Sequence, residues 1–474
     1  MVKGGMGMRK IYSKILLGFA LIMVLATFGF AQSPIQTGTK NNSGLEITVY
    51  NEDLALIKES RALDISAGLG SVSFTDVPAL IDPTSVSFKA DHDGIRVLEQ
   101  NYEYDVVSDA RLLQKFLGEK IKIIGNQGES FEGYLLSTGD DLILASAPKG
   151  GEIRIVKAAQ VKSLIFPELP SGLVLKPTLV WMVQNAGRTG TYPVKVTYLT
   201  GGMSWKADYV ATVNPANDKV DLAGWVTLDN QSGADFNNAR LKLVAGDLHR
   251  VGPDEAGEVR MAKPVLRAMS EDGFKEESFS EYHLYTLNRT TTLRNNQIKQ
   301  VELLSANSIP VKKLFVYNGA LNPKKVQVML EFKNNSASNL GIPLPKGRIR
   351  VQQSDGDGSL QFIGEDRIDH TPKDEKVRVN LGNAFDVVGE RINTGAKEPA
   401  KNIREESYKI TLRNHKEIPV LVTDIESFGS WNEWKIINNS HDYVKTDAGK
   451  AEFTVGVLAG GETVISYTVR YKIQ

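Results

Sequence analysis

Cysteine does not occur anywhere in the 474-residue chain. Its absence excludes disulfide bonds, thiolate metal sites, cysteine nucleophiles and the lipidated cysteine of a lipoprotein. The folded chain must therefore be held together by its hydrophobic cores, and a chain of this length can build several of them.

An excess of charge of either sign is also missing. Lys and Arg together number 56, and Asp and Glu together number 56. Proteins that bind DNA or RNA usually present a basic excess or a basic face, which displaces counterions from the phosphates. We therefore do not expect nucleic acid as a partner.

Sequence signatures of catalysis are absent as well. The chain contains no GxSxG elbow, no HExxH helix and no Walker-type phosphate loop. Five of its six histidines are scattered singly among expected strands and loops: His92, His249, His283, His415 and His441. Isolated histidines of this kind are typical of ordinary packed or exposed side chains, so we expect neither a cofactor nor a metal at these positions.

The first 31 residues predict a secretory signal peptide. Basic residues precede the apolar run ILLGFALIMVLATFGFA, and the small residues Gly29 and Ala31 lie just before an expected cleavage point. An uncleaved membrane anchor is the alternative, because about 17 apolar residues just span a bilayer. Either way we expect an exported protein, in the periplasm or at the cell surface. No later segment is apolar enough to cross a membrane, and residues 32–43 are expected to be disordered.

Alternating apolar and polar residues predict a mainly β fold for the rest of the chain. We expect a multi-domain β-sandwich of the immunoglobulin-like kind, with an N-terminal β region at 44–108 and sandwich strands at 176–250 and 281–474. The charged segment 251–280 has no sustained period and predicts a flexible linker.

Residues 109–169 predict a helix followed by a small closed β-barrel of the SH3 or Sm-like kind. Ser108 caps the expected helix and Gly118 ends it, and five short alternating runs follow. Near the C-terminus we expect a loop at 388–406 and a β-hairpin that turns at Gly460–Gly461.

A five-residue pattern occurs four times after residue 176. Each copy has two apolar residues at period two followed by Asn: Trp181-x-Val183-x-Asn185, Val226-x-Leu228-x-Asn230, Leu330-x-Phe332-x-Asn334 and Ile410-x-Leu412-x-Asn414. Burial of alternate residues, ended by a residue that favours turns, indicates a strand leaving its sheet. We interpret the copies as equivalent strands of successive sandwich units, although so permissive a pattern also arises by coincidence.

The segment GEDRIDH, residues 364–370, is the strongest candidate for an acid–base or metal site. An extended chain places Asp366 and His370 on one face, and Glu365 adds a third polar side chain nearby. No third ligand or nucleophile stands at a diagnostic spacing. We therefore favour a strand, a polar turn and a second strand, and keep a carboxylate- or metal-dependent hydrolase as the alternative.

The preceding stretch QQSDGDGSLQFIGED resembles a calcium loop. Asp355, Asp357, Ser359 and Asp366 fall at loop positions 1, 3, 5 and 12, but Leu360 occupies the position that needs glycine. A hairpin turn at SDGDGS explains the composition better, with weak calcium binding as the alternative.

Several long segments, in order, resemble one bacterial family. They include VYNEDLALIKESRALD, DVPALIDPTSV, MSWKADYVATVN, GWVTLDNQSGADFNNARLKLVAG, EYHLYTLNRTTTLRNNQIKQVELL and GEDRIDHTPKDEKVRVNLGNAFDVVGER. Together they are similar to the domain of unknown function 4139, whose members include exported proteins and relatives of the mucoidy inhibitor. Those relatives often carry a long coiled-coil insert where this chain has residues 109–169. The resemblance implies a mostly β, extracytoplasmic protein, and it implies no established activity and no catalytic residues.

We therefore expect a non-enzymatic cell-envelope protein that acts by contact with an envelope protein or glycan. The hydrolase described above is one alternative. A self-assembling surface component is another, because the Thr-rich stretch 285–301 reads as an exposed edge strand that pairs with a second copy.

Overall fold

The computed structural model describes residues 35–37, 42–170, 172–246, 265–266, 274–429 and 433–472. The predicted signal peptide, residues 1–31, lies outside these ranges. The chain divides into two compact units. The first includes 61–77 and 89–194, and the second includes 42–60, 78–88 and 195–474.

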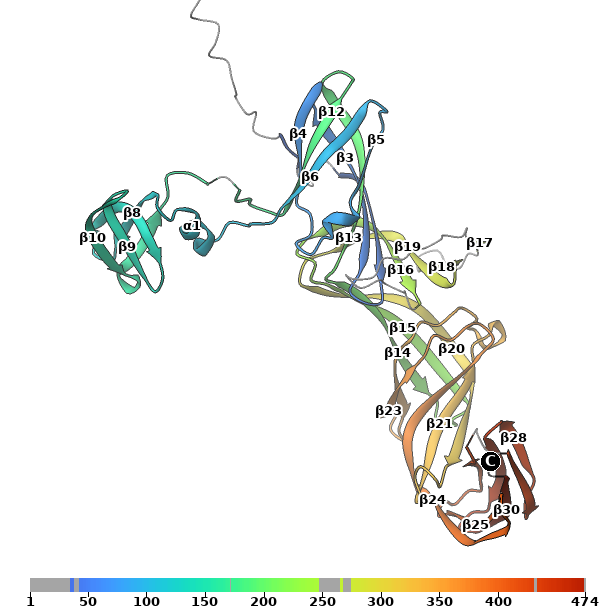
Figure 1. Cartoon of the computed structure of the whole chain (residues 1–474). Helices are drawn as coiled ribbons and strands as arrows, with labels where there is room; N and C mark the ends of the chain where they lie inside the picture. Colours follow the sequence, from blue (N-terminus) through green and yellow to red (C-terminus); the bar gives the residue numbers. More distant parts are fainter. Residues whose placement is uncertain are drawn as a thin grey trace, which may run out of the picture. The chain divides into compact units, whose positions relative to one another are not determined.

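The fold is mainly β with one α-helix among the described residues, as the sequence predicts (Figure 1). The first unit contains a four-stranded sheet in the order β1 (Ile35–Thr37), β4 (Gly68–Thr75), β12 (Thr178–Asn185), β6 (Ile95–Glu103). Its core includes the fully buried Phe74 and Trp181, whose ring centroids lie 5.4 Å apart. The Trp181 indole N–H donates to the Gln100 side chain at 2.8 Å, so the one polar atom of this ring is satisfied.

The helix predicted near residue 109 is confirmed as α1 (Asp109–Lys115). The Ser108 hydroxyl accepts a hydrogen bond from the Arg111 N–H at 3.2 Å, and Gly118 follows with a φ of 85°. Phe116 then packs into a small apolar core with Ile123 and Leu135. The local signals for capping and termination therefore placed this helix correctly.

Five strands follow the helix, but they do not form the closed barrel that we expected. They are β7 (Lys120–Gly125), β8 (Ser130–Thr138), β9 (Asp141–Ala147), β10 (Gly150–Lys157) and β11 (Val161–Ile165). Their order is β10-β9-β8-β7-β11, so β10 and β11 are the two edges of an open sheet. A 3-10 turn at Ala158–Gln160 links these edges in place of a hydrogen-bonded ladder. The number of strands was readable from the alternation, and the closure was not.

An eight-stranded sheet contributes to the start of the second unit. Its order is β17 (Val265–Leu266), β18 (Phe274–Phe279), β19 (Tyr282–Leu293), β16 (Phe236–Ala245), β2 (Asn42–Tyr50), β3 (Ala55–Ile65), β13 (Gly190–Thr200), β5 (Ser87–Ala90). Two expectations change here. Most of the predicted linker 251–280 lies outside the described residues, but 274–279 is a strand paired with β19. The predicted disordered segment 32–43 contains β1 and the first residues of β2.

A thirteen-stranded sheet forms most of the second unit. Its main path is β23 (Leu360–Ile368), β22 (Gly347–Ser354), β14 (Met203–Val213), β15 (Lys219–Asn230), β20 (Gln297–Tyr317), β21 (Lys325–Lys333), β24 (Lys376–Ala400), β25 (Ile403–Asn414), β30 (Glu462–Lys472), β27 (Glu433–Asn439). The strands β26 (Val420–Ser427), β29 (Lys450–Val457) and β28 (Tyr443–Asp447) branch from β20.

Two long strands run through this sheet. Residues 297–310 of β20 pair with β15, and residues 311–317 of the same strand pair with β21. In the same way, the first part of β24 pairs with β21 and its last part pairs with β25. The predicted loop at 388–406 is therefore wrong, because these residues are the β24–β25 hairpin.

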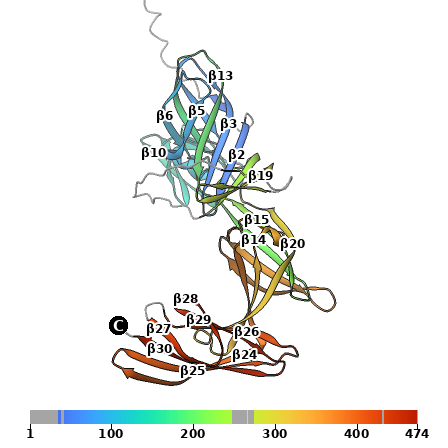
Figure 2. The same ribbon diagram turned by 90° about the vertical axis from the view of Figure 1, so that its right-hand side faces the viewer.

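The C-terminal sandwich has two layers, β24-β25-β30-β27 and β26-β29-β28 (Figure 2). Between them lie buried side chains from both layers, among them Leu412, Phe453 and Tyr467. The predicted hairpin at Gly460–Gly461 is wrong, because β29 pairs with β26 and β28 while β30 pairs with β25 and β27. The glycine turn carries the chain from one layer to the other.

The expected edge strand at 285–301 is the second part of β19 and the start of β20. Residues 285–287 pair with β16 on one side and β18 on the other, whereas 288–293 pair with β16 alone and 297–301 pair with β15 alone. Much of this stretch thus has one side without a strand partner among the described residues, and its pairing with a second copy remains a prediction.

The four repeated Asn residues do occupy equivalent strand ends. All four are buried, and each side chain bonds backbone groups of the segments around the strand end: Asn185, Asn230, Asn334 and Asn414. In Asn414, for example, the amide N–H groups donate to three carbonyl oxygens and the amide oxygen accepts from the Lys416 N–H. Burial of an amide is tolerated because its donors and acceptor are satisfied.

Among the helices that the structure describes, none has the length and apolar character needed to cross a membrane.

Candidate functional site

The GEDRIDH segment forms the end of β23 and the turn after it. Burial alternates as expected, because Ile368 is buried and its neighbours Arg367 and Asp369 are exposed. The carboxylate of Asp366 accepts from the backbone N–H of Asn380 on β24 at 2.7 Å. This contact ties two strands together, which gives Asp366 a structural task.

Glu365 and His370 have different neighbours. The Glu365 carboxylate lies 3.5 Å from Arg350 and 3.9 Å from Arg348, both on β22. Nδ1 of His370 accepts from the Lys346 N–H at 3.2 Å. The described part of the chain contains no group of three or more His, Cys, Asp or Glu side chains that could hold a metal ion. A catalytic or metal role for Glu365, Asp366 and His370 remains a prediction.

The candidate calcium ligands are divided between two places. Asp355, Asp357 and Ser359 form the turn between β22 and β23, where Asp355 accepts from the backbone N–H groups of Asp357 and Ser359. Hydrogen bonds from the Asp355 side chain and the Ser359 N–H lower the pKa of Asp357 to about 2. Asp366 instead lies opposite Ile349, far along the hairpin. Seven residues of strand separate it from Ser359, or roughly 20 Å, so the structure does not bring the four together.

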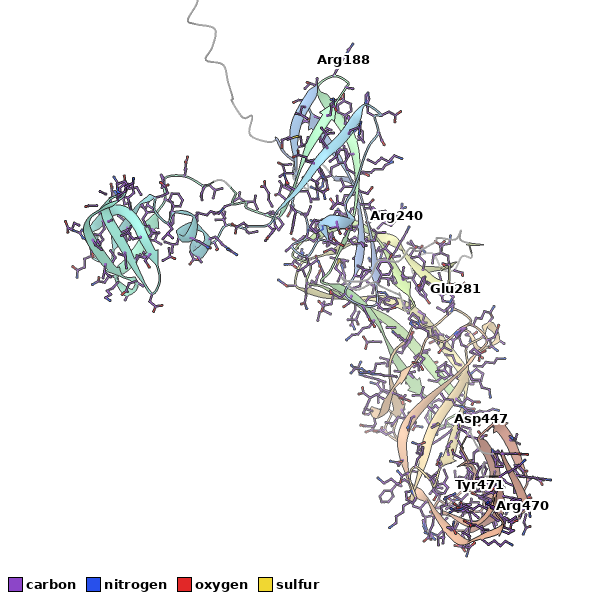
Figure 3. All side chains as sticks on the ribbon, viewed as in Figure 1. Arg188, Arg240, Glu281, Asp447, Arg470 and Tyr471 are labelled. Atoms are coloured by element: carbon purple, nitrogen blue, oxygen red, sulfur yellow. The ribbon has the colours of Figure 1, made fainter. Side chains whose placement is uncertain are left out.

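A hollow of about 550 Å³ lies on the face of the eight-stranded sheet. Its lining comes from β19, β16, β2, β3 and β13, which are consecutive neighbours in that sheet. Among the residues that line it are Glu46, Lys58, Lys195, Thr197, Arg240 and Thr290. Figure 3 labels Arg240. All of the lining residues belong to the second unit.

Register explains why these polar side chains meet. Arg240 on β16 is directly opposite Glu46 on β2 and opposite Thr290 on β19. Since side chains alternate between the faces of a strand, paired residues project from the same face. The other face carries buried residues of the same strands, such as Ile47 and Leu241. The hollow is therefore the polar face of a sheet whose opposite face is core.

Cations outnumber carboxylates in the lining of this hollow, which includes Lys58, Lys195 and Arg240 together with Glu46 and the buried Glu59. Glu46 lies 2.9 Å from Lys58 and 3.1 Å from Lys242. Burial raises the pKa of Glu46, but hydrogen bonds from the two lysines outweigh it and leave the pKa below its ordinary value. One carboxylate thus lies between two ammonium groups, with Arg240 and Lys195 on the same hollow.

A second polar cluster lies inside the C-terminal sandwich, and no motif in the sequence predicts it. Glu426 on β26 is fully buried and receives a two-pronged ion pair from Arg391 on β24, with N–O distances of 2.9 to 3.1 Å. The Tyr467 hydroxyl donates to Glu426 at 2.5 Å. The Arg391 guanidinium also lies 3.7 Å from the centroid of the Tyr408 ring.

Asp424 is two residues before Glu426 and is also fully buried. Neither of its carboxylate oxygens has a hydrogen-bond partner among the described residues. Burial, and next the charge of Glu426, raise the pKa of Asp424 well above its ordinary value. The signal was present in the sequence VLVTDIES, because Asp424 and Glu426 continue the inward positions of Val420 and Val422.

Comparison with known proteins decides the family. The model for the domain of unknown function DUF4139 matches residues 194–473. The chain belongs to the DUF4139 family. Among curated proteins, none matches the chain.

The DUF4139 segment contains every candidate residue of β22 to β30, including Asp366, His370 and the buried Asp424. It contains only part of the sheet hollow. Arg240 and Lys195 lie within the DUF4139 match, whereas Glu46 and Lys58 come before it. The hollow is thus built by DUF4139 strands together with two strands from the N-terminal part of the chain.

Proposed function

We propose that this DUF4139 protein is an exported, non-enzymatic binding protein that holds an anionic glycan of the cell envelope on the face of its eight-stranded sheet. The observation that carries the proposal is the cationic hollow formed by Lys58, Lys195 and Arg240. The basic and apolar N-terminus, with small residues before an expected cleavage point, supports export.

The shape of the hollow suits an extended ligand. It is open and crosses five neighbouring strands, so a chain molecule can lie across them. Glycans offer hydroxyl groups as well as charge, and Thr197, Thr290 and Ser60 add hydroxyl groups to the lining. Lys and Arg attract carboxylate or sulfate groups over a distance of about 10 Å at moderate salt. The same side chains donate charge-assisted hydrogen bonds at contact.

The test uses polygalacturonate as an acidic polymer and dextran as a neutral one. We expect the purified full chain to bind polygalacturonate in a titration calorimeter, with affinity that falls steeply as salt rises. The double variant Lys58→Glu/Arg240→Glu should lose at least about tenfold in affinity, because two favourable contacts become repulsive.

A matched control is Lys409→Glu/Lys435→Glu, two charge reversals on the C-terminal sandwich. It makes the same change in net charge and should bind as the parent does. Equal loss in both variants, or equal binding of dextran and polygalacturonate, would show that the hollow is not the site.

A further inference from the structure

The strand β10 is an edge of the open five-stranded sheet and is exposed along most of its length. Seven of its eight residues are exposed, and only Val156 is buried. Ile153 and Ile155 are 61% and 57% exposed, although isoleucine is usually buried. An edge strand that exposes two β-branched apolar residues tends to pair with another strand, which buries them.

Backbone geometry makes this edge a template for another strand. The strand β10 pairs regularly with β9 from Ile153 to Lys157. In an antiparallel ladder every second residue directs its N–H and C=O groups away from the neighbour. On an edge strand these groups point outward, so a further strand can bond to them.

The charges beside Ile153 are self-complementary. Glu152 and Arg154 have opposite sign and form an ion pair with each other at 3.4 Å, but their side chains are 75% and 50% exposed and so can also reach a second strand. When two copies of this strand run antiparallel with Ile153 opposite Ile153, Glu152 of each copy lies opposite Arg154 of the other. Opposite charges in cross-strand pairs stabilise, and like charges destabilise. A two-fold arrangement repeats the favourable pair twice.

We propose that two copies of the chain associate through antiparallel pairing of their β10 strands, with Ile153 on the two-fold axis. Glu152–Arg154 contacts then form on one face of the paired strands, and Ile153 and Ile155 of both copies form an apolar cluster on the other face. This surface is separate from the glycan-binding hollow, and either proposal can fail without the other.

The absence of cysteine makes a sharp test possible, since a single introduced cysteine is unique in the chain. Directly opposite residues have Cα atoms about 4.5–5.5 Å apart, within reach of a disulfide. We therefore expect Ile153→Cys in the full chain to form a disulfide-linked dimer under mild oxidation.

Ile155→Cys is the matched control, because its exposure is similar. In the proposed register the two copies of residue 155 are four residues apart along the strands, or roughly 13 Å, which is too far for a disulfide. The linked fraction should be about tenfold lower than for Ile153→Cys. Equal linking of the two variants would indicate random collision, and stronger linking at 155 would show a different register; either result overturns the proposal.

Charge reversal tests the same dimer interface without an introduced cysteine. We expect the parent to show a concentration-dependent dimer in sedimentation velocity. Glu152→Arg should weaken it about tenfold, and Glu152→Arg/Arg154→Glu should restore it. A parent that stays monomeric at high concentration, or a double variant that stays as weak as the single one, would overturn the proposal. Binding of a foreign protein strand to β10 by a strictly monomeric chain would do so as well.

Discussion

The most direct test of the fold is a substitution that replaces the side-chain amide of Asn414 with a carboxyl group. Asn414→Asp keeps the shape of the side chain and replaces the amide NH2 with an oxygen. The amide nitrogen of Asn414 donates to the carbonyl oxygens of Ile418 at 2.8 Å, Leu458 at 3.1 Å and Val457 at 3.3 Å. After the substitution, a carboxylate oxygen faces these carbonyl oxygens.

The expected cost follows from the number of bonds lost. Each buried hydrogen bond contributes about 1 kcal/mol net, and an unsatisfied buried group costs about 1–3 kcal/mol. Loss of three donor contacts therefore predicts destabilisation of the C-terminal sandwich by about 3 kcal/mol, or roughly a hundredfold in its opening equilibrium. The bond from the Lys416 N–H at 3.0 Å should survive, because its acceptor remains.

Hydrogen–deuterium exchange read by mass spectrometry measures this opening in β25 and β30. We expect faster exchange in both strands at pH 7. We also expect partial recovery under acidic conditions, because a protonated carboxyl regains one donor. Asn438→Asp is the control: its side chain is exposed on β27, and exchange should not change. The reasoning is refuted if Asn414→Asp exchanges as slowly as the parent, since the buried amide would then contribute nothing.

Two further substitutions probe the same sandwich. Asp424 has a raised pKa in the folded state, so its contribution to stability is present below its ordinary pKa and is lost as the pH rises. Asp424→Asn should therefore raise the melting temperature at pH 8 and leave it almost unchanged at pH 4. An equal shift at both pH values would argue against ionisation of Asp424 near Glu426 as the cause. Gly389→Ala should lower the free energy of unfolding by about 1–3 kcal/mol, because its new Cβ would lie 2.3 Å from the buried Tyr317 ring. Urea unfolding measures this change. Gly456→Ala is the control and should leave the free energy of unfolding unchanged, because a Cβ at Gly456 meets nothing within 4 Å.

Local physics made much of the fold predictable from the sequence. The helix at Asp109–Lys115 has its own cap and its own stop, and both act within a few residues. The Asn repeat was visible because period-two burial and the strand-ending amide occur within five residues, as at Trp181 and Asn185. Such features depend on neighbours in the chain.

Pairing partners could not be predicted in the same way. Residues 450–457 and 462–472 alternate as the arms of a hairpin would, yet they belong to different layers. A turn sequence specifies that the chain reverses and does not specify which sheet receives the next strand. The predicted closure of the small sheet failed for this reason, because closure depends on long-range partners.

The candidate sites show the same division. Burial on alternate positions around Asp366 and His370 was foreseen, but the backbone contact to Asn380 depends on β24, fourteen residues away. The buried pair of Glu426 and Arg391 depends on residues 35 apart. Polar residues at apolar positions of a strand were the available signal, and a search for known motifs does not detect it.

The strands β20 and β24 have a mechanical consequence. Each is an unbroken extended segment whose two ends belong to different partners, so a pull on one part of the sheet reaches the next through covalent backbone. A flexible connector would absorb such a pull by straightening. Dividing the chain at residue 310 or at residue 387 would cut β20 or β24 into two parts, and each of the two resulting fragments would have an uncovered core. In the role that we propose, this construction would transmit load between neighbouring parts of the sheet with little slack.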